Sequence, residues 1–97
     1  MEHDRRTDVR RKIRELWKIG RVNPTHHADE RFRESGLADR DVWNVLKHGA
    51  IFKVDAPRGV ARYHLRGKSF AGDWVVCPVE IEGDELIIVT VFLEKLS

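Results

Sequence analysis

The sequence predicts an α+β protein, with about three N-terminal helices packed on one side of a mostly antiparallel sheet of about four strands. Apolar residues recur at helical spacing up to about residue 48. From Ile51 onward, apolar and polar residues alternate and β-branched residues become frequent, which is typical of strands. Helices followed by antiparallel strands constitute the α+β layout.

The length favours one domain. The chain has 97 residues, and single domains commonly contain about 50 to 250 residues. No repeat, low-complexity tract or Pro/Gly-rich linker divides it. We therefore predict a single domain over residues 1–97, with a helical part over 8–48 and a sheet part over 51–93.

Three helices are expected in the first half. Apolar side chains on one side predict a helix over residues 8–19; they are Val9, Ile13, Leu16 and Trp17. Thr25 is expected to cap a second helix, which Gly36 ends. Asp39 is expected to cap a third helix that ends at residues 47–49. Trp43 lies off the apolar stripe of this third helix, which suggests a contact with a partner.

The second half is expected to form strands. Pro78 cannot donate a hydrogen bond to a ladder, so it predicts an edge strand or a bulge. Glu82, Gly83 and Asp84 suit a hairpin loop, whereas residues 23–25 suit a turn between the first two helices. The expected strands cover residues 51–54, 60–66, 74–81 and 86–93.

Charge is distributed unevenly along the chain, although the net charge is only +2. Basic residues dominate residues 1–21, and residues 58–68 carry four basic and no acidic side chains. Residues 73–97 are strongly acidic. Clustered Lys and Arg gain free energy from counterion release at phosphate backbones, so RNA is an expected partner. A solvated helix face is the alternative explanation for the N-terminal run.

The termini and the cysteine content favour a soluble, cytoplasmic chain. The first residues, MEHDRRTDVRRK, lack an apolar signal core. The longest apolar stretch, residues 86–93, is shorter than the about 20 residues needed to span a bilayer. The lone Cys77 cannot form an internal disulfide. We therefore expect no membrane association.

His27 and Arg31 form the first candidate cluster, one turn apart on the expected second helix. Ala28 and Phe32 beside them would face the core, so the pair is expected at the border between core and solvent. The alternative is a half-buried histidine held by a backbone or carboxylate partner.

Arg62, His64 and Arg66 form the second cluster, because alternate residues of a strand point to one face about 6.5 to 7 Å apart. Three such groups repel one another unless an anion is present. We assign RNA binding to Arg66, Lys68, Arg10 and Arg14, and catalysis to His27, Arg31, Arg62 and His64.

Two imidazoles and several guanidiniums suit RNA cleavage without a metal or other cofactor. A base takes the proton of the ribose 2′-hydroxyl, arginines stabilise the phosphorane and an acid protonates the leaving 5′-oxygen. No zinc site is predicted, because His26, His27, His64 and Cys77 lack a recognised ligand spacing. The alternatives are a non-catalytic RNA-binding module and a protein-binding module.

Several short motifs resemble one bacterial family. They are His27-Ala28-x-x-Arg31, Glu34-Ser35-Gly36-Leu37, Asp41-Val42, Gly49 and Val89-Thr90-Val91. Over residues 25–93 they resemble domain-of-unknown-function family 4258, in which arginine is usual where Ser35 stands. The chain is also distantly similar to RelE-like ribonuclease toxins. That similarity implies metal-independent RNA cleavage and an antitoxin protein as partner.

Overall fold

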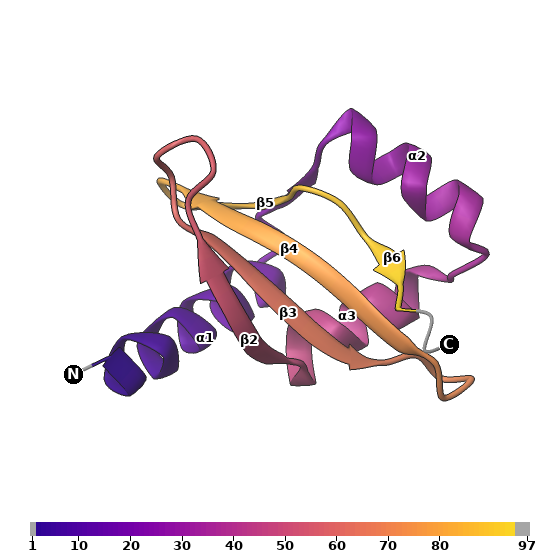
Figure 1. Cartoon of the computed structure of the whole chain (residues 1–97), viewed down its shortest axis with the longest axis horizontal. Coiled ribbons are helices and arrows are strands. Elements are labelled where there is room, and N and C mark those ends of the chain that lie inside the picture. Colours follow the sequence, from indigo (N-terminus) through magenta and orange to yellow (C-terminus); the bar gives the residue numbers. More distant parts are fainter. Residues whose placement is uncertain (1, 95–97) are drawn as a thin grey trace.

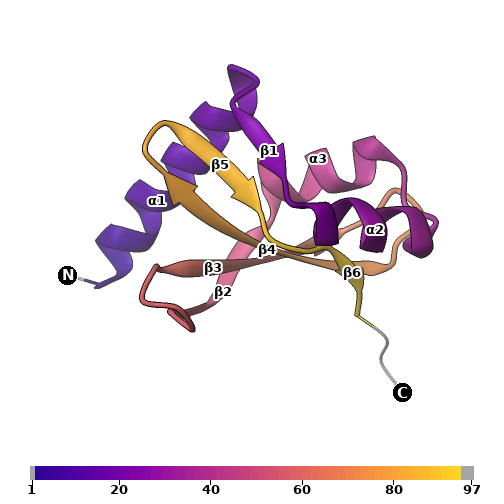
Figure 2. The same cartoon turned by 90° about the horizontal axis from the view of Figure 1, so that it is seen from above.

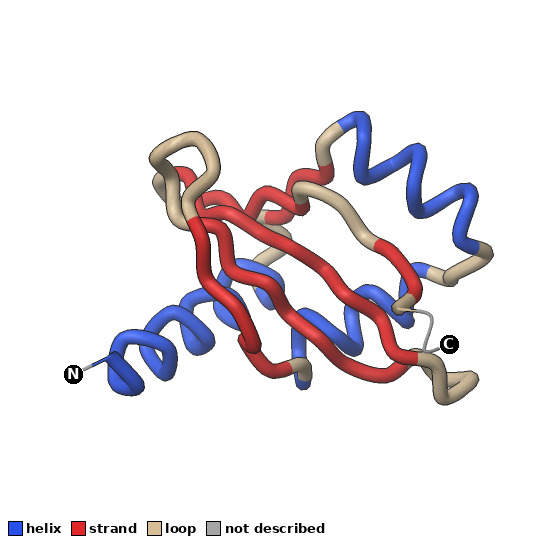
Figure 3. The backbone as a smooth tube through the Cα atoms, in the orientation of Figure 1, coloured by secondary structure: helices blue, strands red, loops and turns tan. Residues whose placement is uncertain are grey.

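The computed structural model describes residues 2–94 and confirms the α+β class, with three helices and one mixed sheet (Figure 1). Helices and strands are coloured separately in Figure 3. In chain order the elements are α1 (Glu2–Lys18), β1 (Val22–Pro24), α2 (His26–Ser35), α3 (Asp39–His48), β2 (Ala50–Asp55), β3 (Arg62–Lys68), β4 (Trp74–Glu82), β5 (Glu85–Ile88) and β6 (Phe92–Leu93).

The sheet has six strands rather than about four, and it is mixed rather than wholly antiparallel. Its order is β1-β5-β4-β3-β2, and β6 pairs with β4. The expected turn at residues 23–25 is largely strand β1, which runs parallel to β5. A strand of three residues is too short to show an alternating pattern, so the sequence did not reveal it.

The expected strand over residues 86–93 is divided into β5 and β6. Residues 89–91, between these two strands, are not part of a strand. Thr25 binds this segment, because its hydroxyl donates to the Val89 carbonyl oxygen at 2.9 Å. The same hydroxyl accepts the Ala28 N–H at 3.0 Å and thereby caps α2. One side chain thus joins the start of α2 to the sheet.

Pro78 lies in the interior strand β4, between β3 and β5, and the expectation of an edge strand is wrong. The Pro78 carbonyl accepts the Val89 N–H at 2.9 Å. The N–H and C=O of one strand residue point to the same side, so the N–H that proline lacks would also point towards residues 89–91. No strand pairs with β4 at residues 89–91, so the absence of an N–H at Pro78 removes no hydrogen bond between paired strands.

The helix limits agree with the sequence in part. Helix α2 begins after Thr25 and ends at Gly36, which has a φ of 75°. Helix α1 begins earlier than expected, at Glu2. Helix α3 is capped by Ala38 rather than Asp39, and the Asp41 carboxylate accepts the Ala38 N–H at 2.9 Å. The Asp41 carboxylate thus satisfies the N–H of the N-cap residue, which is the reciprocal half of a capping box, and the Ala38 side chain supplies no cap oxygen.

The helices lie on one side of the central strands, as the view from above shows (Figure 2). Helix α3 packs on β3 and β4, and α1 packs on α3 and β5. Side chains from both layers fill the core between them: Ile13, Leu16, Val42, Val45, Leu46, Leu65, Val75, Cys77, Val79, Leu86, Ile88 and Val91. None of the helices in residues 2–94 combines the length and the apolar character that crossing a membrane requires.

Candidate functional site

Strand β3 places its polar side chains on the sheet face that the helices do not cover. Leu65 is fully buried in the core, which confirms the predicted alternation. Its neighbours on the other face are Arg62, His64, Arg66 and Lys68. We call this surface of β2, β3 and β4 the helix-free face.

His64 is the central titratable group of the helix-free face. Its Nε2 atom lies 3.0 Å from Oδ1 of Asp55 on β2, and its side chain is 15% exposed. The hydrogen bond from His64 is the main cause of a lowered pKa of Asp55. A carboxylate only accepts hydrogen bonds, so a neutral His64 carries its proton on Nε2 and leaves a lone pair on Nδ1.

The arginines on either side of His64 are ion-paired. The Nη2 atom of Arg62 lies 3.0 Å from Oε2 of Glu80 on β4, and both side chains are less than a fifth exposed. The Nε atom of Arg66 lies 2.8 Å from Oε2 of Glu94, and both side chains are about a third exposed. The expectation of an unbalanced cationic strand face is therefore corrected, because neighbouring segments supply the carboxylates.

Aromatic rings accompany these charges. The guanidinium of Arg66 lies 4.4 Å from the Trp74 ring centroid, and the Lys68 ammonium lies 5.0 Å from it. Phe52 meets the His64 ring edge-on, with centroids 6.1 Å apart. Phe52 is 48% exposed and Phe92 is 42% exposed. The helix-free face thus combines cations with accessible ring surfaces.

His27 and Arg31 lie one turn apart on α2, as predicted, and both are exposed. Arg31 lines a hollow beside α2 together with Phe92 of β6. Helix α2 packs beside β1 and β6, whereas His64 projects from the opposite face of β3. Strand β4 lies between β6 and β3, and β5 and β4 lie between β1 and β3, which corresponds to about 10 to 14 Å. The structure therefore does not bring His27 and His64 together.

Arg10 and Arg14 bind the carboxyl end of α3. Arg10 is 8% exposed, and it donates to the carbonyl oxygens of Gly49 and Leu46, both at 2.6 Å. Arg14 donates to the Lys47 carbonyl at 2.9 Å. Burial, together with the nearby Arg14, lowers the pKa of Arg10 to about 10, so it stays protonated at neutral pH. We therefore leave Arg10 out of the proposed RNA contacts.

Among residues 6–94, whose side chains the structure describes, no group of three or more His, Cys, Asp or Glu side chains is arranged to hold a metal ion. The buried Cys77 faces the core, where desolvation raises its pKa to about 12. This environment agrees with the expectation that Cys77 acts as a small apolar core residue rather than as a nucleophile.

Sequence reasoning missed the carboxylates of the site. Asp55 follows directly after the expected strand 51–54, but only the register of β2 against β3 places it near His64. A bulge between Ile51 and Lys53 shifts that register. Glu80 and Glu94 likewise reach the helix-free face through pairings that the local sequence does not specify.

These features define a small α+β domain with an ion-paired, aromatic-bearing sheet face and a histidine–aspartate pair at its centre. The family model of a domain of unknown function (DUF4258) matches residues 25–93. The chain therefore belongs to this family, and the match extends from the capping Thr25 of α2 to the end of β6. Comparisons with curated proteins and with solved structures find no match.

Proposed function

We propose that the chain is a small endoribonuclease that cleaves RNA on the helix-free face by imidazole acid–base chemistry, without a metal. The observation that carries this proposal is the 3.0 Å contact between His64 and Asp55, on a strand where Arg62 and Arg66 are the next side chains on the same face. A carboxylate that orients an imidazole is a recurring arrangement in acid–base catalysis.

His64 is the base in the proposed reaction. Its Nδ1 atom takes the proton of a ribose 2′-hydroxyl while the 2′-oxygen forms a bond to phosphorus and the bond from phosphorus to the 5′-oxygen breaks. The departing 5′-oxygen takes a proton from water, and the resulting hydroxide takes the proton from the His64 imidazolium. The products are a 2′,3′-cyclic phosphate and a 5′-hydroxyl. Asp55 stabilises the imidazolium that forms in between.

Arg66 and Lys68 are the proposed phosphate contacts. The pair of Arg66 with Glu94 is about a third exposed, and such ion pairs contribute only about 0 to 1 kcal/mol. A bound phosphate can therefore displace Glu94 from Arg66. Arg62 is ion-paired with the more buried Glu80. We therefore propose that Arg62 fixes the position of Glu80 beside His64 and does not contact the phosphate directly.

The exposed rings give single-stranded RNA a second source of affinity. Phe52 and Phe92 offer stacking surfaces, and one base stacked on an aromatic side chain contributes about 1 to 3 kcal/mol. Stacking tolerates any base, so we expect weak sequence preference from the isolated protein.

The test is cleavage of labelled single-stranded RNA in EDTA by the parent, His64→Gln and His27→Gln. The parent and His27→Gln should cleave equally. The cleavage rate of His64→Gln should be lower by about 100-fold or more, the usual contribution of a positioned acid–base group. A substrate with a single 2′-deoxyribose should resist cleavage at that position. Full activity in folded His64→Gln, or cleavage of the deoxy position, contradicts the mechanism.

A non-catalytic RNA-binding module is the second candidate, favoured by the ion pairing of Arg62 and Arg66 and by the exposed rings. Such a module should retain RNA in a salt-dependent manner without cutting it. Intact but retained RNA, with retention lowered in Lys68→Ala and Phe52→Ala, would establish this function instead.

We also propose that this activity belongs to a toxin–antitoxin pair, as the distant similarity to RelE-like toxins that the sequence predicts implies, with a second protein neutralising the nuclease. Expression of the parent and of His64→Gln in bacterial cells distinguishes a toxin from a nuclease that does not affect growth. Growth arrest by the parent but not by His64→Gln supports a toxin, whereas normal growth with active nuclease contradicts it.

A further inference from the structure

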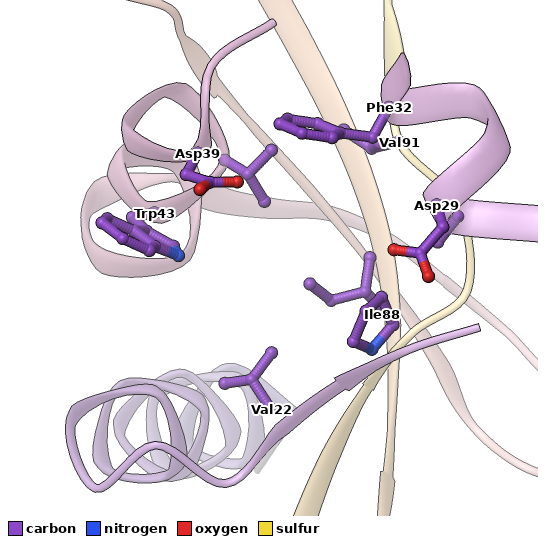
Figure 4. Close-up of a pocket in the computed structure, with 10 residues that line it drawn as sticks. Val22, Asp29, Phe32, Asp39, Trp43, Ile88 and Val91 are labelled. Carbon is purple, nitrogen blue, oxygen red and sulfur yellow. The ribbon is translucent and has the colours of Figure 1, made fainter. Parts of the chain in front are cut away.

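A small pocket opens between α2, α3, β1 and β5, on the side of the sheet opposite the helix-free face (Figure 4). Its volume is about 210 Å³, which is below the about 300 to 1,000 Å³ of pockets that take whole drug-sized ligands. The pocket therefore suits one side chain rather than a larger ligand. Its apolar lining includes Val22, Phe32, Val42, Ile88 and Val91.

Two carboxylates face each other across this apolar pocket. Asp29 projects from α2 and Asp39 from α3, at opposite sides of the opening (Figure 4). Neither side chain makes a hydrogen bond or an ion pair with residues 6–94, the part of the chain whose side chains are described. Each lies in the first turn of its helix, where the helix dipole contributes about half a positive charge. Two full negative charges exceed this contribution, so the opening is negative.

Trp43 links the pocket to a wider apolar surface. It lines the pocket and also lines a neighbouring hollow that contains Phe70 and three basic residues, Arg40, Lys47 and His48. Trp43 is 51% exposed and Phe70 is 65% exposed, and the guanidinium of Arg40 lies 5.0 Å from the Phe70 ring. Trp and Arg are the residue types that most often dominate the binding energy of protein interfaces.

We infer that this surface is the docking site of a partner polypeptide, which inserts one arginine or lysine side chain into the pocket lined by Asp29 and Asp39. The aliphatic stem would pack on the apolar lining while the cation meets the two carboxylates. Flanking apolar residues of the partner would cover Trp43 and Phe70. Charge complementarity at the pocket favours a basic side chain there, whereas the neighbouring hollow carries Arg40 and Lys47, so the residues of the partner that cover it would be apolar rather than basic.

This inference does not depend on the proposed nuclease, because the two surfaces lie on opposite sides of the sheet. The amphipathic opening also gives a role to Trp43, which lies off the core stripe of α3 and is half exposed. A free amine could satisfy the carboxylates alone, but it would leave the Trp43 and Phe70 surface uncovered.

The test uses the full chain and three blocked peptides: acetyl-Ala-Leu-X-Leu-Ala-amide with X as arginine, citrulline or glutamate. Citrulline has the shape of arginine without its charge. Binding is followed by the amide and indole NMR signals of the isotope-labelled protein. The arginine peptide should shift the signals of Val22, Ile88 and Trp43. It should bind about fivefold more tightly than the citrulline peptide, the upper range for a partly exposed ion pair, and the glutamate peptide should bind most weakly.

Variants then locate the charge effect. In the double variant Asp29→Asn/Asp39→Asn, the arginine and citrulline peptides should bind equally, whereas Asp84→Asn in the distant β4–β5 hairpin should leave their difference unchanged. Trp43→Ala should weaken the binding of all three peptides. The comparison of peptides on the parent protein does not depend on the folding of any variant.

Three results with the peptides would overturn the inference, and a fourth concerns a small cation. They are equal binding of the arginine and citrulline peptides to the parent, the absence of shifts at the pocket with any peptide, and shifts confined to the helix-free face. Tighter binding of free butylguanidine than of the arginine peptide would also overturn it, since the ligand would then be a small cation rather than a polypeptide.

Discussion

Arg10 and Gly49 are 39 positions apart in the chain, yet the Nε atom of Arg10 donates a hydrogen bond to the Gly49 carbonyl oxygen at 2.6 Å. The same guanidinium reaches the carbonyl oxygens of Val45 and Leu46. These carbonyls belong to the last turn of α3 and its C-cap, where few backbone acceptors have partners within the helix. The Gly49 N–H also donates to the Val45 carbonyl at 2.7 Å, so Arg10 adds to this local cap and links α1 to α3.

We expect Arg10→Met to lower the free energy of unfolding by about 2 to 3 kcal/mol, since it removes charged hydrogen bonds from a buried site. Arg10→Lys should recover only part of this loss, because an ammonium cannot reproduce the guanidinium fork. Denaturant unfolding gives the values. The exposed Arg11→Met is the control and should change stability by less than about 0.5 kcal/mol. Equal stability of both Met variants would contradict the capping role.

Gly49→Ala should destabilise the protein by about 1 to 3 kcal/mol, the usual cost of overpacking. A Cβ atom at this position would lie 2.5 Å from the Val45 carbonyl oxygen and 3.0 Å from that of Arg66. Both obstacles are backbone atoms and cannot move aside easily. Gly67→Ala is the matched comparison, because its Cβ would approach no atom closer than 3.3 Å. Thermal unfolding should show the larger loss for Gly49→Ala, and the reverse order would refute the steric account.

Asp41→Asn should lower stability at neutral pH by about 1 to 2 kcal/mol, as for other lost helix caps. Asp41 accepts the Ala38 and Phe70 N–H groups, both at 2.9 Å. These two bonds, with Phe70 first, lower the pKa of Asp41 below its ordinary 3.8. An amide can accept only with its oxygen, so one of the two N–H groups loses its partner.

The Asp41 effect should depend on pH in one direction. A carboxyl whose pKa is lowered by folding contributes its full stability above its unfolded pKa of 3.8. That contribution is lost as the pH falls through the lower folded value. The difference between parent and Asp41→Asn should thus be constant above about pH 5 and shrink below pH 3.8. A difference that stays constant below about pH 3 would contradict this role of the Asp41 carboxylate.

The His64–Asp55 pair makes a prediction that is independent of catalysis. The hydrogen bond from His64 is the main cause of the lowered Asp55 pKa, so His64→Ala should raise that pKa towards 3.8. Carboxyl NMR signals followed through an acid titration give the value. Lys53→Ala, which removes a weaker charge contact at 3.7 Å, should raise the pKa less. An unchanged pKa in folded His64→Ala would show that the pair does not form in solution.

Cys77 should resist thiol reagents in the folded protein. The side chain is fully buried and its pKa is raised to about 12 by desolvation, and the thiolate is the reactive form. Modification by an aromatic disulfide reagent at pH 8 should proceed only after denaturant is added. Rapid reaction of the native protein would indicate that β4 opens locally.

Local sequence patterns were sufficient to predict the features that depend only on neighbouring residues, such as helix caps and strand alternation. Thr25 and Gly36 delimit α2 because one supplies a cap oxygen and the other adopts a positive φ. Leu65 faces the core because alternation in a strand places its neighbours on the other face. The motif from His27 to Gly36 also pointed to the family that the match over residues 25–93 confirms. Trp43, off the stripe of α3, was expected at the surface and lies there.

Long-range pairing decided the remainder. The parallel pairing of β1 with β5 and the division of the last strand around Pro78 depend on contacts between segments far apart in the chain. The same is true of the carboxylates that neutralise β3, since strand register is a property of two segments and not of one. Arg10 has the charge of a nucleic-acid contact, but its position buries it against α3.

The sequence by itself determined which residues form helices, which face of β3 is polar and to which family the chain belongs, because these follow from short-range periodicity, capping chemistry and motif spacing. Only the tertiary structure decided which charges pair and which pockets exist. It separated His27 from His64, joined His64 to Asp55 and set Asp29 opposite Asp39. Such neighbours are created when distant segments pack together to bury the apolar core, and no local pattern encodes them.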